Sequence, residues 1–282
     1  MNETGYGKLY ITATPIGNLG DMSPRAVEVL KEAELIAAED TRNTIKLLNH
    51  FEIKTPMTSY HEFNRFDKAD ELVEKMLEGT DVAIVTDAGT PCISDPGEVL
   101  VQKCVEAGIE VTSIPGPSAV ITALTLSGFS VRRFVFEGFL PPKQKKRDRK
   151  EAIDRIRNET GTIVLYEAPH RLKETLKELA GVFGPERRIA MCREMTKKHE
   201  EVIRTTIGEA ADREPRGEYV LVIEGKSLEA INEEIKAGFE DMSIEEHLEL
   251  YISKGMDKKA AMKAVANDRG LSKRDVYNAL ER

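Results

Sequence analysis

The residues best suited to chemistry in this sequence gather in one short stretch of small, acidic and hydroxylated residues, Asp87–Gly97. The stretch follows the apolar run Val82–Thr86, which we expect to be a buried strand. Small residues let backbone amides come close to a ligand, and carboxylates and hydroxyls can bind its amino and hydroxyl groups. Ordinary strand–turn–helix connections use the same residue types. These residues alone therefore support a ligand site and a plain connection equally.

A second stretch of this kind is Ile114–Ala119, in which two prolines bracket Gly116. The prolines predict a stiff turn that a ligand can approach closely. Ser118 would then face the ligand at the start of the next helix. A rigid loop without a ligand is the alternative, and it is disfavoured if this turn lies beside the first stretch.

A third stretch, Thr12–Asp21, follows the first predicted strand. Glu39 and Asp40 come about 20 residues later, which imitates the spacing of a dinucleotide-binding fingerprint. However, the stretch lacks the G-x-G-x-x-G pattern, and Pro15 stands where the first glycine of the tight turn belongs. The sequence therefore disfavours a dehydrogenase.

An alternation of strands and helices must position these three stretches. The predicted strands are Leu9–Ala13, Leu35–Ala38, Met57–Tyr60, Val82–Thr86, Ile109–Ile114 and Phe134–Phe136. The predicted helices are Ser23–Glu34, Thr41–His50, Asn64–Glu78, Gly97–Ala107 and Ser118–Ser127. Such alternation predicts a mostly parallel sheet covered on both faces. Ligands of these sheets bind at the carboxyl ends of the strands, which is where all three stretches fall.

The pattern changes at Leu140-Pro141-Pro142, where a highly charged stretch begins. We therefore predict an α/β domain over residues 1–139 that carries the cleft. A second α/β domain is expected over residues 140–240. Its strands Arg188–Cys192 and Glu201–Thr206 follow each other without a helix, which indicates a mixed sheet.

Residues 241–282 are expected to form a separate helical unit. Ser243 and Glu246 make a capping box, Asp257 can cap the next helix, and Gly255 and Gly270 can end helices. Three short capped helices in this order resemble a helix-turn-helix. Acids and bases balance in this tail, so a packing or dimerisation role is as well supported as contact with RNA.

The net charge of −8 is distributed unevenly. Residues 132–157 contain ten basic and four acidic residues, so this segment is +6 while the rest of the chain is −14. A positive segment in an acidic protein suits a phosphate backbone, and nearby phenylalanines favour RNA over a plain solvated helix face. The residues expected to contact RNA are Arg132, Arg133, Lys143, Lys145, Lys146, Arg147, Arg149 and Lys150.

Neither a metal site nor a membrane association is predicted. The three cysteines are scattered, and the five histidines show no ligand spacing. No apolar run is long enough to span a bilayer. The start of the chain lacks the pattern of a signal peptide, so we expect a cytoplasmic protein.

Several strings of residues together resemble one known family. They are T-P-I-G-N-L-G-D (Thr14–Asp21), A-E-D-T-R (Ala38–Arg42), S-Y-H-E-x-N (Ser59–Asn64), D-A-G-T-P-x-I-S-D-P-G (Asp87–Gly97), P-G-P-S-A (Pro115–Ala119), Y-E-A-P-H-R (Tyr166–Arg171), R-E-M-T-K (Arg193–Lys197) and G-E-Y-V-L-V-I-E-G (Gly217–Gly225). With these strings the sequence resembles the tetrapyrrole methylase superfamily of S-adenosylmethionine (SAM) enzymes. Within it, the sequence is most similar to the branch that methylates ribose in small-subunit ribosomal RNA.

This resemblance implies two α/β domains with SAM bound in the cleft between them, in a homodimer. It implies 2′-O-methylation of a decoding-centre cytidine in 16S rRNA, with the small ribosomal subunit as partner. The residues that it implies for SAM binding are Pro15, Gly17, Asp87, Ala88, Gly89, Thr90, Pro91, Ile93, Ser94, Ser118, Ala119, Tyr166, Glu167, Ala168 and Pro169.

Methyl transfer from a sulfonium to a ribose hydroxyl needs alignment, exclusion of water and help with proton loss. The candidates for this help are Asp87, His170, Glu194 and Lys197. The ordinary pKa of histidine lies near neutrality, which makes His170 an attractive base, but the sequence does not decide among the four candidates. The alternative is that His170 only caps the helix that it starts.

Two other functions fit part of the sequence. A methylase of a small tetrapyrrole would keep the donor site but would need neither the basic segment nor the helical tail. A non-catalytic RNA-binding ribosome-assembly factor would need no acids and glycines in the three stretches.

Overall fold

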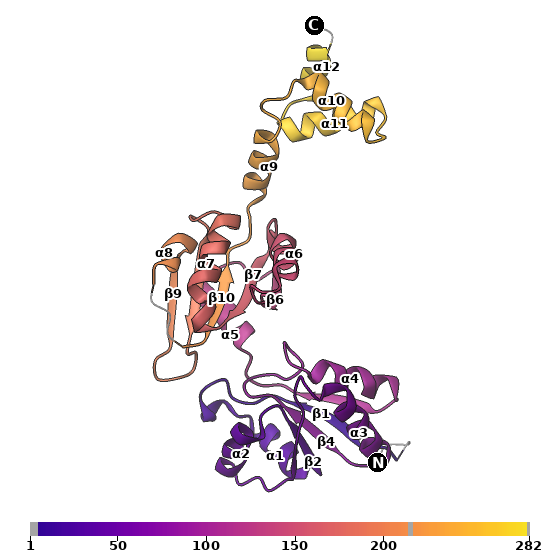
Figure 1. The fold of residues 1–282 in the computed structure, drawn as a ribbon, viewed down its shortest axis with the longest axis vertical. Helices are drawn as coiled ribbons and strands as arrows, with labels where there is room; N and C mark the ends of the chain where they lie inside the picture. Colours follow the sequence, from indigo (N-terminus) through magenta and orange to yellow (C-terminus); the bar gives the residue numbers. More distant parts are fainter. Residues whose placement is uncertain (1–4, 214–216, 281–282) are drawn as a thin grey trace.

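The computed structural model describes residues 5–213 and 217–280, which form two sheets and a helical tail (Figure 1). The first sheet has the strand order β3-β2-β4-β1-β5, and all its pairings are parallel. Its strands are β1 (Lys8–Thr12), β2 (Leu35–Ala38), β3 (Met57–Ser59), β4 (Val82–Val85) and β5 (Glu110–Ile114). The predicted parallel sheet is confirmed, and the carboxyl ends of its strands share one edge.

Helices cover both faces of this sheet. They are α1 (Pro24–Glu32), α2 (Thr41–His50), α3 (Arg65–Leu77) and α4 (Gly97–Glu106), while the short 3₁₀ helix η1 (Leu19–Asp21) has no buried residue. Leu30 and Leu48 bring α1 and α2 onto one face. Leu72 and Leu100 bring α3 and α4 onto the other. Burying apolar side chains on both faces is what allows β2 and β4 to be wholly apolar.

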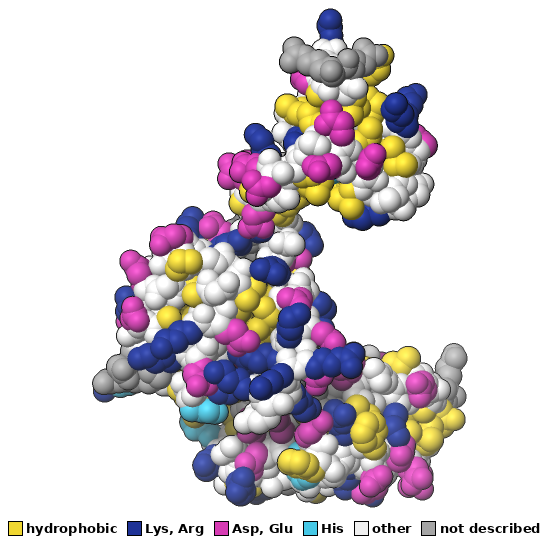
Figure 2. Space-filling view, turned by 45° about the horizontal axis from the view of Figure 1, so that its top comes forward, with side chains coloured by type: hydrophobic (Ala, Val, Ile, Leu, Met, Phe, Trp, Pro, Cys, Tyr) yellow, Lys and Arg dark blue, Asp and Glu magenta, His cyan; other side chains and the backbone are white. Residues whose placement is uncertain are grey.

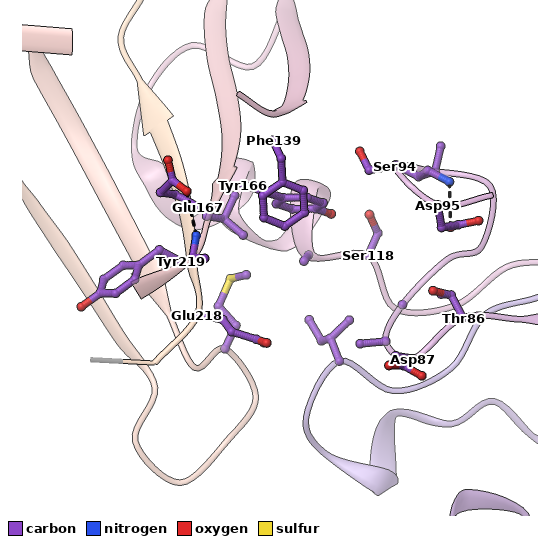
Figure 3. Close-up of a pocket in the computed structure, with 18 of the residues that line it drawn as sticks. Thr86, Asp87, Ser94, Asp95, Ser118, Phe139, Tyr166, Glu167, Glu218 and Tyr219 are labelled. Carbon is purple, nitrogen blue, oxygen red and sulfur yellow. Dashed lines mark hydrogen bonds between the residues drawn. The ribbon is translucent and has the colours of Figure 1, made fainter. Parts of the chain in front are cut away.

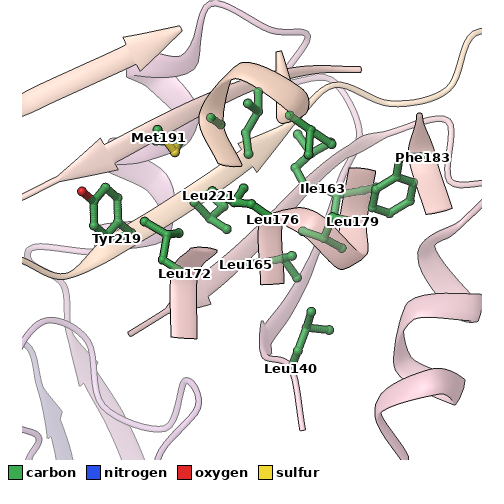
Figure 4. Close-up of a cluster of buried hydrophobic side chains, with 14 of the residues drawn as sticks. Leu140, Ile163, Leu165, Leu172, Leu176, Leu179, Phe183, Met191, Tyr219 and Leu221 are labelled. Carbon is green, nitrogen blue, oxygen red and sulfur yellow. The ribbon is translucent and has the colours of Figure 1, made fainter. Parts of the chain in front are cut away.

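The second sheet has the order β6-β7-β10-β8-β9. Its strands are β6 (Phe134–Phe139), β7 (Thr162–Glu167), β8 (Arg188–Arg193), β9 (Glu201–Thr206) and β10 (Tyr219–Ile223). Only β6 and β7 pair in parallel, which confirms the mixed sheet. Helix α5 (Ala119–Ser127) covers one face. The other face is covered by α6 (Lys146–Ile156), α7 (Pro169–Phe183) and α8 (Ile207–Ala211), whose side chains form the cluster in Figure 4.

The structure assigns the strand before residue 139 differently from the sequence prediction. Phe134–Phe139 pairs with β7, with Phe134 opposite Thr162, and therefore belongs to the second sheet. Helix α5 also packs on this sheet, because Val120 and Leu124 lie in its core. The predicted boundary at 139/140 therefore falls too late, and we propose that the first unit ends after β5. A strand's own residues do not specify which of two sheets it joins.

The chain crosses between the two units at Pro115–Ser118 (Figure 1). This crossing joins the end of β5 to the start of α5. Gly116 lies so close to Ala13 that a β-carbon on it would be 2.9 Å from the Ala13 side chain. The predicted stiff turn is thus also the connection between the units.

The tail contains α9 (Leu228–Ala237), α10 (Ile244–Ser253), α11 (Lys258–Arg269) and α12 (Lys273–Leu280). The capping box of Ser243 and Glu246 forms as predicted, and the Asp257 carboxylate caps α11. Gly270 ends α11 in the left-handed conformation, with φ +63°. In the parts of the chain that the structure describes, no helix combines the length and apolarity needed to cross a membrane.

A buried histidine lies in the core of the tail. His247 is 0 % exposed and stacks on Phe239, with ring centroids 3.6 Å apart. Its Nδ1 accepts a hydrogen bond from Arg269 at 3.2 Å, and its Nε2 lies 3.4 Å from the Asp268 carboxylate. Burial lowers the pKa of His247 and Arg269 lowers it further, against the opposing effect of Asp268. The imidazole is therefore neutral in the folded tail.

We expect the tail to lose stability as the pH falls below 6.5, the ordinary pKa of histidine. The unfolded tail binds the proton more readily because the pKa is lower in the folded state, so stability is full above this value and declines below it. Hydrogen exchange of α10 and α11 amides in the full chain measures this. His247→Phe should remove the dependence; an equal pH response in this variant would contradict the prediction.

Candidate active site

A cavity of about 430 Å³ lies between the two sheet-bearing units (Figure 3). The first unit contributes Thr86, Asp87, Ser94 and Asp95 from the loop after β4, and Ser118 lies in the crossing between β5 and α5. The second unit contributes Phe139, Tyr166, Glu167, Glu218 and Tyr219 from the opposite side. The volume falls within the usual range for small-molecule sites.

The three loops of the first unit are bonded to one another. Thr14 and Gly89 exchange two backbone hydrogen bonds of 2.9 and 3.1 Å. The Thr90 hydroxyl donates to the Pro117 carbonyl at 3.0 Å. Gly89 has φ +85°, which favours glycine. The predicted clustering of these loops at one edge is therefore observed.

A carboxylate pair lies where β2 and β4 end. Glu39 accepts a hydrogen bond of 2.5 Å from the Thr86 hydroxyl. Partial burial raises the pKa of Asp87, and the nearby Glu39 carboxylate raises it further. The Asn43 amide donates to Asp87 at 3.4 Å and partly offsets both effects. A cationic ligand beside this pair would relieve the repulsion.

The loop after Asp87 is backbone-strained. Cys92 and Ser94 have φ of +70° and +65°, values that non-glycine residues rarely adopt. The Asp95 carboxylate holds the loop by accepting from the Gly97 and Ile93 amides at 2.8 and 3.2 Å. Burial nevertheless raises the pKa of Asp95. Such strain is often retained at functional sites.

The wall from the second unit is built on a buried carboxylate. Glu167 is 2 % exposed and accepts a 2.6 Å hydrogen bond from Thr175. Arg171 lies 3.4 Å from the other carboxylate oxygen. The Tyr166 ring packs against Phe139, with centroids 5.3 Å apart. Burial raises the pKa of Tyr166. This wall combines aromatic surface with one fixed charge.

An ion pair closes another side of the cavity. The Lys197 ammonium lies 3.3 Å from Glu194 and 3.9 Å from Glu218. Burial alone would raise the pKa of Glu194, but the Glu218 amide and the Lys197 charge outweigh it, so the pKa is lowered. A β-carbon on Gly17 would lie 2.5 Å from Cγ of Lys197. The first unit therefore packs directly against the stem of this lysine.

The cavity is acidic. Its described lining contains six carboxylates and one ammonium: Glu39, Asp87, Asp95, Glu167, Glu194, Glu218 and Lys197. Among the residues that the structure describes, no group of three or more His, Cys, Asp or Glu could hold a metal ion. The arrangement suits a cationic organic ligand.

Residues 8–211 match the family of tetrapyrrole (corrin/porphyrin) methylases. The chain belongs to this methylase family. It is 46 % identical to the ribosomal RNA small subunit methyltransferase I of Halalkalibacterium halodurans, over 96 % of this chain and 94 % of that protein. It is also 46 % identical to the protein of that name from Bacillus subtilis, over 98 % of this chain and 95 % of that protein.

The fold of this methylase is shared with more distant proteins. A uroporphyrin-III C-methyltransferase from Thermus thermophilus, solved in complex with S-adenosylhomocysteine, matches with a TM-score of 0.56. The match covers 77 % of this chain and 92 % of that chain at 15 % identity. The resemblance found in the sequence and the predicted fold class, two α/β units with a helical tail, are confirmed.

Most predicted site residues of the methylase line the cavity. They are Asp87, Ala88, Gly89, Thr90, Ile93, Ser94, Ser118, Ala119, Tyr166, Glu167, Ala168, Pro169, Glu194 and Lys197. Pro15 and Gly17 instead line a neighbouring pocket, and Pro91 is buried beneath its loop. His170 is exposed outside the cavity and makes no side-chain cap for α7. Pro169 faces the cavity, and the next residue of a helix points about 100° away.

Sequence reasoning missed part of the lining. Glu218, Tyr219 and Val220 come from the start of β10, and Met195 and Phe139 complete the wall. All but Phe139 lie in strings that resemble the family (Gly217–Gly225 and Arg193–Lys197), but the strings do not show which members face the cavity, because this depends on the pairing of β10 with β8, with Tyr219 opposite Arg193. Glu39 and Asp95 did lie in motifs of the predicted loops.

The basic segment is exposed with one exception. Arg132, Arg133, Lys143, Lys145, Lys146, Arg147 and Lys150 are exposed. Arg149 is 3 % exposed, so its predicted contact with RNA is wrong. Its guanidinium bonds to Glu178 at 2.7 Å, to the Pro141 carbonyl at 2.8 Å and to Thr175 at 3.0 Å. Helix α6 turns Arg149 toward the core because it shares a face with Ala152, Ile153 and Ile156.

Proposed function

We propose that this chain transfers a methyl group from SAM to the 2′-hydroxyl of a decoding-centre cytidine in 16S rRNA. The observation that carries the proposal is the acidic cavity between the two units. Membership of the methylase family and the names of the relatives support ribosomal RNA of the small subunit as the substrate. We expect the protein to act as a cytoplasmic homodimer, as the family resemblance implies.

The residues present fit SAM. The donor carries an amino group and a sulfonium, both of which a cavity with six carboxylates would favour. Gly89 allows its loop to pack closely against the loop after β1, since a β-carbon there would lie 3.2 Å from the Ile16 side chain. Backbone groups of Ala88–Thr90 and the hydroxyl of Ser118 would hold the polar ends, and Tyr166 and Phe139 offer apolar surface.

When bound, SAM supplies a methyl group activated by a positive sulfur. The residues of this chain would supply the remaining contributions to catalysis. Loops from both units exclude water and fix the direction of approach of the ribose. Lys197, held by Glu194, would stabilise the negative charge that develops on the 2′-oxygen. Asp87 would accept the proton, and its raised pKa would make it a better base than an ordinary aspartate.

An acidic cavity repels a polyanion, so RNA needs a positive surface beside it. Figure 2 shows Lys and Arg side chains gathered on the middle unit, on the side toward the N-terminal unit. Lys145, Lys146 and Arg147 are exposed at the start of α6 in this unit. We propose that they hold the phosphate backbone while a single nucleotide reaches the cavity.

The function is tested by incubating the protein with methyl-labelled SAM and either unmethylated small ribosomal subunits or a porphyrinoid. We expect label on the 2′-oxygen of one cytidine in the subunit. Labelling of the porphyrinoid alone would identify a tetrapyrrole, and not RNA, as the methyl acceptor. Binding of SAM in a calorimeter without labelling of either acceptor would contradict both.

Reversing the charge of Lys145 and Lys146 to glutamate is expected to weaken RNA binding. Loss of two phosphate contacts should reduce the slope of log affinity against log salt by about two. The matched control reverses Lys31 and Lys54, which are exposed on the first unit away from both pockets. Equal salt slopes for both double variants would exclude this segment from the RNA interface.

A further inference from the structure

A second pocket, of about 230 Å³, adjoins the cavity. Thr86 and Asp87 line both, so the β4 loop forms the wall between them. The far side is formed by Pro15, Gly17 and Leu19 after β1 and by residues of α2. The predicted SAM residues Pro15 and Gly17 therefore belong to a separate space, which the binding of SAM does not explain.

We infer that this second pocket receives the nucleoside whose 2′-hydroxyl is methylated, an inference that rests on the proposed function. Its two leucines, Leu19 and Leu47, offer apolar walls for the faces of a base. Lys46 adds a positive charge at the same pocket, suited to the nucleotide's phosphate. The volume has room for one nucleoside but not for a tetrapyrrole macrocycle. A nucleotide extruded from the RNA strand thus finds stacking, charge and polar groups together.

Asn43 gives the pocket a preference for cytosine. Its amide nitrogen donates to the Asp87 carboxylate at 3.4 Å. An ionised carboxylate only accepts hydrogen bonds, so this contact fixes which end of the amide is the NH₂ group. Among the described residues no other hydrogen bond engages this amide, so the Asn43 carbonyl oxygen and its second N–H are available to the base. Cytosine offers an amino donor and a ring-nitrogen acceptor on its pairing edge, whereas uracil offers a carbonyl where cytosine has the amino group.

The position of Asp87 links recognition to chemistry. The same carboxylate orients Asn43 in the second pocket and lines the cavity where the methyl donor would lie. A base held by Asn43 would place its own ribose near the shared wall. The nucleoside is then selected at the point where its hydroxyl is activated.

The first test uses small subunits with cytidine or uridine at the target position. Asn43→Ala should lower the cytidine-to-uridine ratio of kcat/KM about tenfold, and Lys46→Ala should raise KM for subunits about tenfold. Calorimetric affinity for SAM should stay unchanged in both. Lys31→Ala, which removes a charge outside both pockets, is the control. An unchanged ratio and KM, or a matching loss of SAM affinity, would overturn the inference.

The second test does not depend on methylation. The chain has no tryptophan, so Leu19→Trp creates a single tryptophan at the pocket, whose emission can be excited selectively. Leu19 is 42 % exposed and tolerates a larger side chain toward solvent. Cytidine monophosphate should quench this tryptophan and leave a Leu77→Trp control unaffected. If RNA is methylated but the tryptophan is not quenched, nucleoside binding in this pocket is refuted and the proposed function stands. If the tryptophan is quenched but no RNA is methylated, the proposed function is refuted and nucleotide binding in the pocket stands.

Discussion

Replacing Arg149 with alanine is expected to lower the free energy of unfolding by about 2–3 kcal/mol, the usual scale for losing a buried, charged hydrogen-bond donor. Arg149 is almost fully buried and joins Glu178, Thr175 and the Pro141 carbonyl. Its loss leaves Thr175 and the Pro141 carbonyl without this donor, whereas the Glu178 side chain is 34 % exposed and can be solvated. Urea unfolding of the full chain, followed by circular dichroism, measures the change.

The neighbouring Arg147→Ala is the matched control. The Arg147 side chain is 89 % exposed and pairs with Glu151 one helical turn away, at 2.8 Å. Exposed pairs of this kind contribute roughly 0.3–0.5 kcal/mol. Arg147→Ala should instead weaken RNA binding, which Arg149→Ala should change only through stability. Equal stability losses in the two variants would refute the structural role of Arg149.

The basic segment also contains a helical periodicity of buried positions, which its many charged residues make easy to overlook. Arg149, Ala152, Ile153 and Ile156 recur at helical spacing and are all buried. Applied to the basic segment, the same rule that identified the first-unit helices would have separated Arg149 from its exposed neighbours. Counting charge included Arg149 among the expected RNA contacts, because the net charge of a segment does not show which of its side chains face solvent.

Local sequence patterns were sufficient to predict most helices and strands, but they were insufficient to predict which of them pack together. Ser23 followed by proline predicts the start of α1, and the Ser23 hydroxyl does cap it, accepting from Ala26 at 3.1 Å. The apolar runs predict the strands of the first sheet nearly to the residue. The sheet that β6 joins depends on its pairing with β7, a contact between distant residues that no local pattern encodes.

The same limit applies to the site. The three first-unit loops could be predicted because the carboxyl ends of parallel strands meet at one edge. Glu218 could not, because its place follows from the register of antiparallel strands in the other unit. His170 was favoured for its pKa, but the structure leaves it outside the cavity on the first turn of α7. Chemical suitability says nothing about direction around a helix.

Replacing Lys197 with methionine is expected to reduce the single-turnover methylation rate by about 10²–10³-fold, the usual effect of losing one group that stabilises a developing oxyanion. Methionine keeps the apolar stem that packs against Gly17, so the two units should stay together. The affinity for SAM should change little, since the donor is itself cationic. Rapid-quench kinetics with saturating SAM and small subunits measure the rate.

Glu194→Gln tests whether the Lys197 ammonium must be held in place by Glu194 for the full rate. Glu194 lies 3.3 Å from Lys197, and its loss frees the lysine without removing its charge. The rate should therefore fall by less than in Lys197→Met, and the double variant should be no slower than Lys197→Met alone. His170→Ala, outside the cavity, is the control and should leave the rate unchanged. If Lys197→Met retained the full rate, the lysine would serve only to join the two units, and Asp87 would be left to assist proton loss without a cation beside the oxygen.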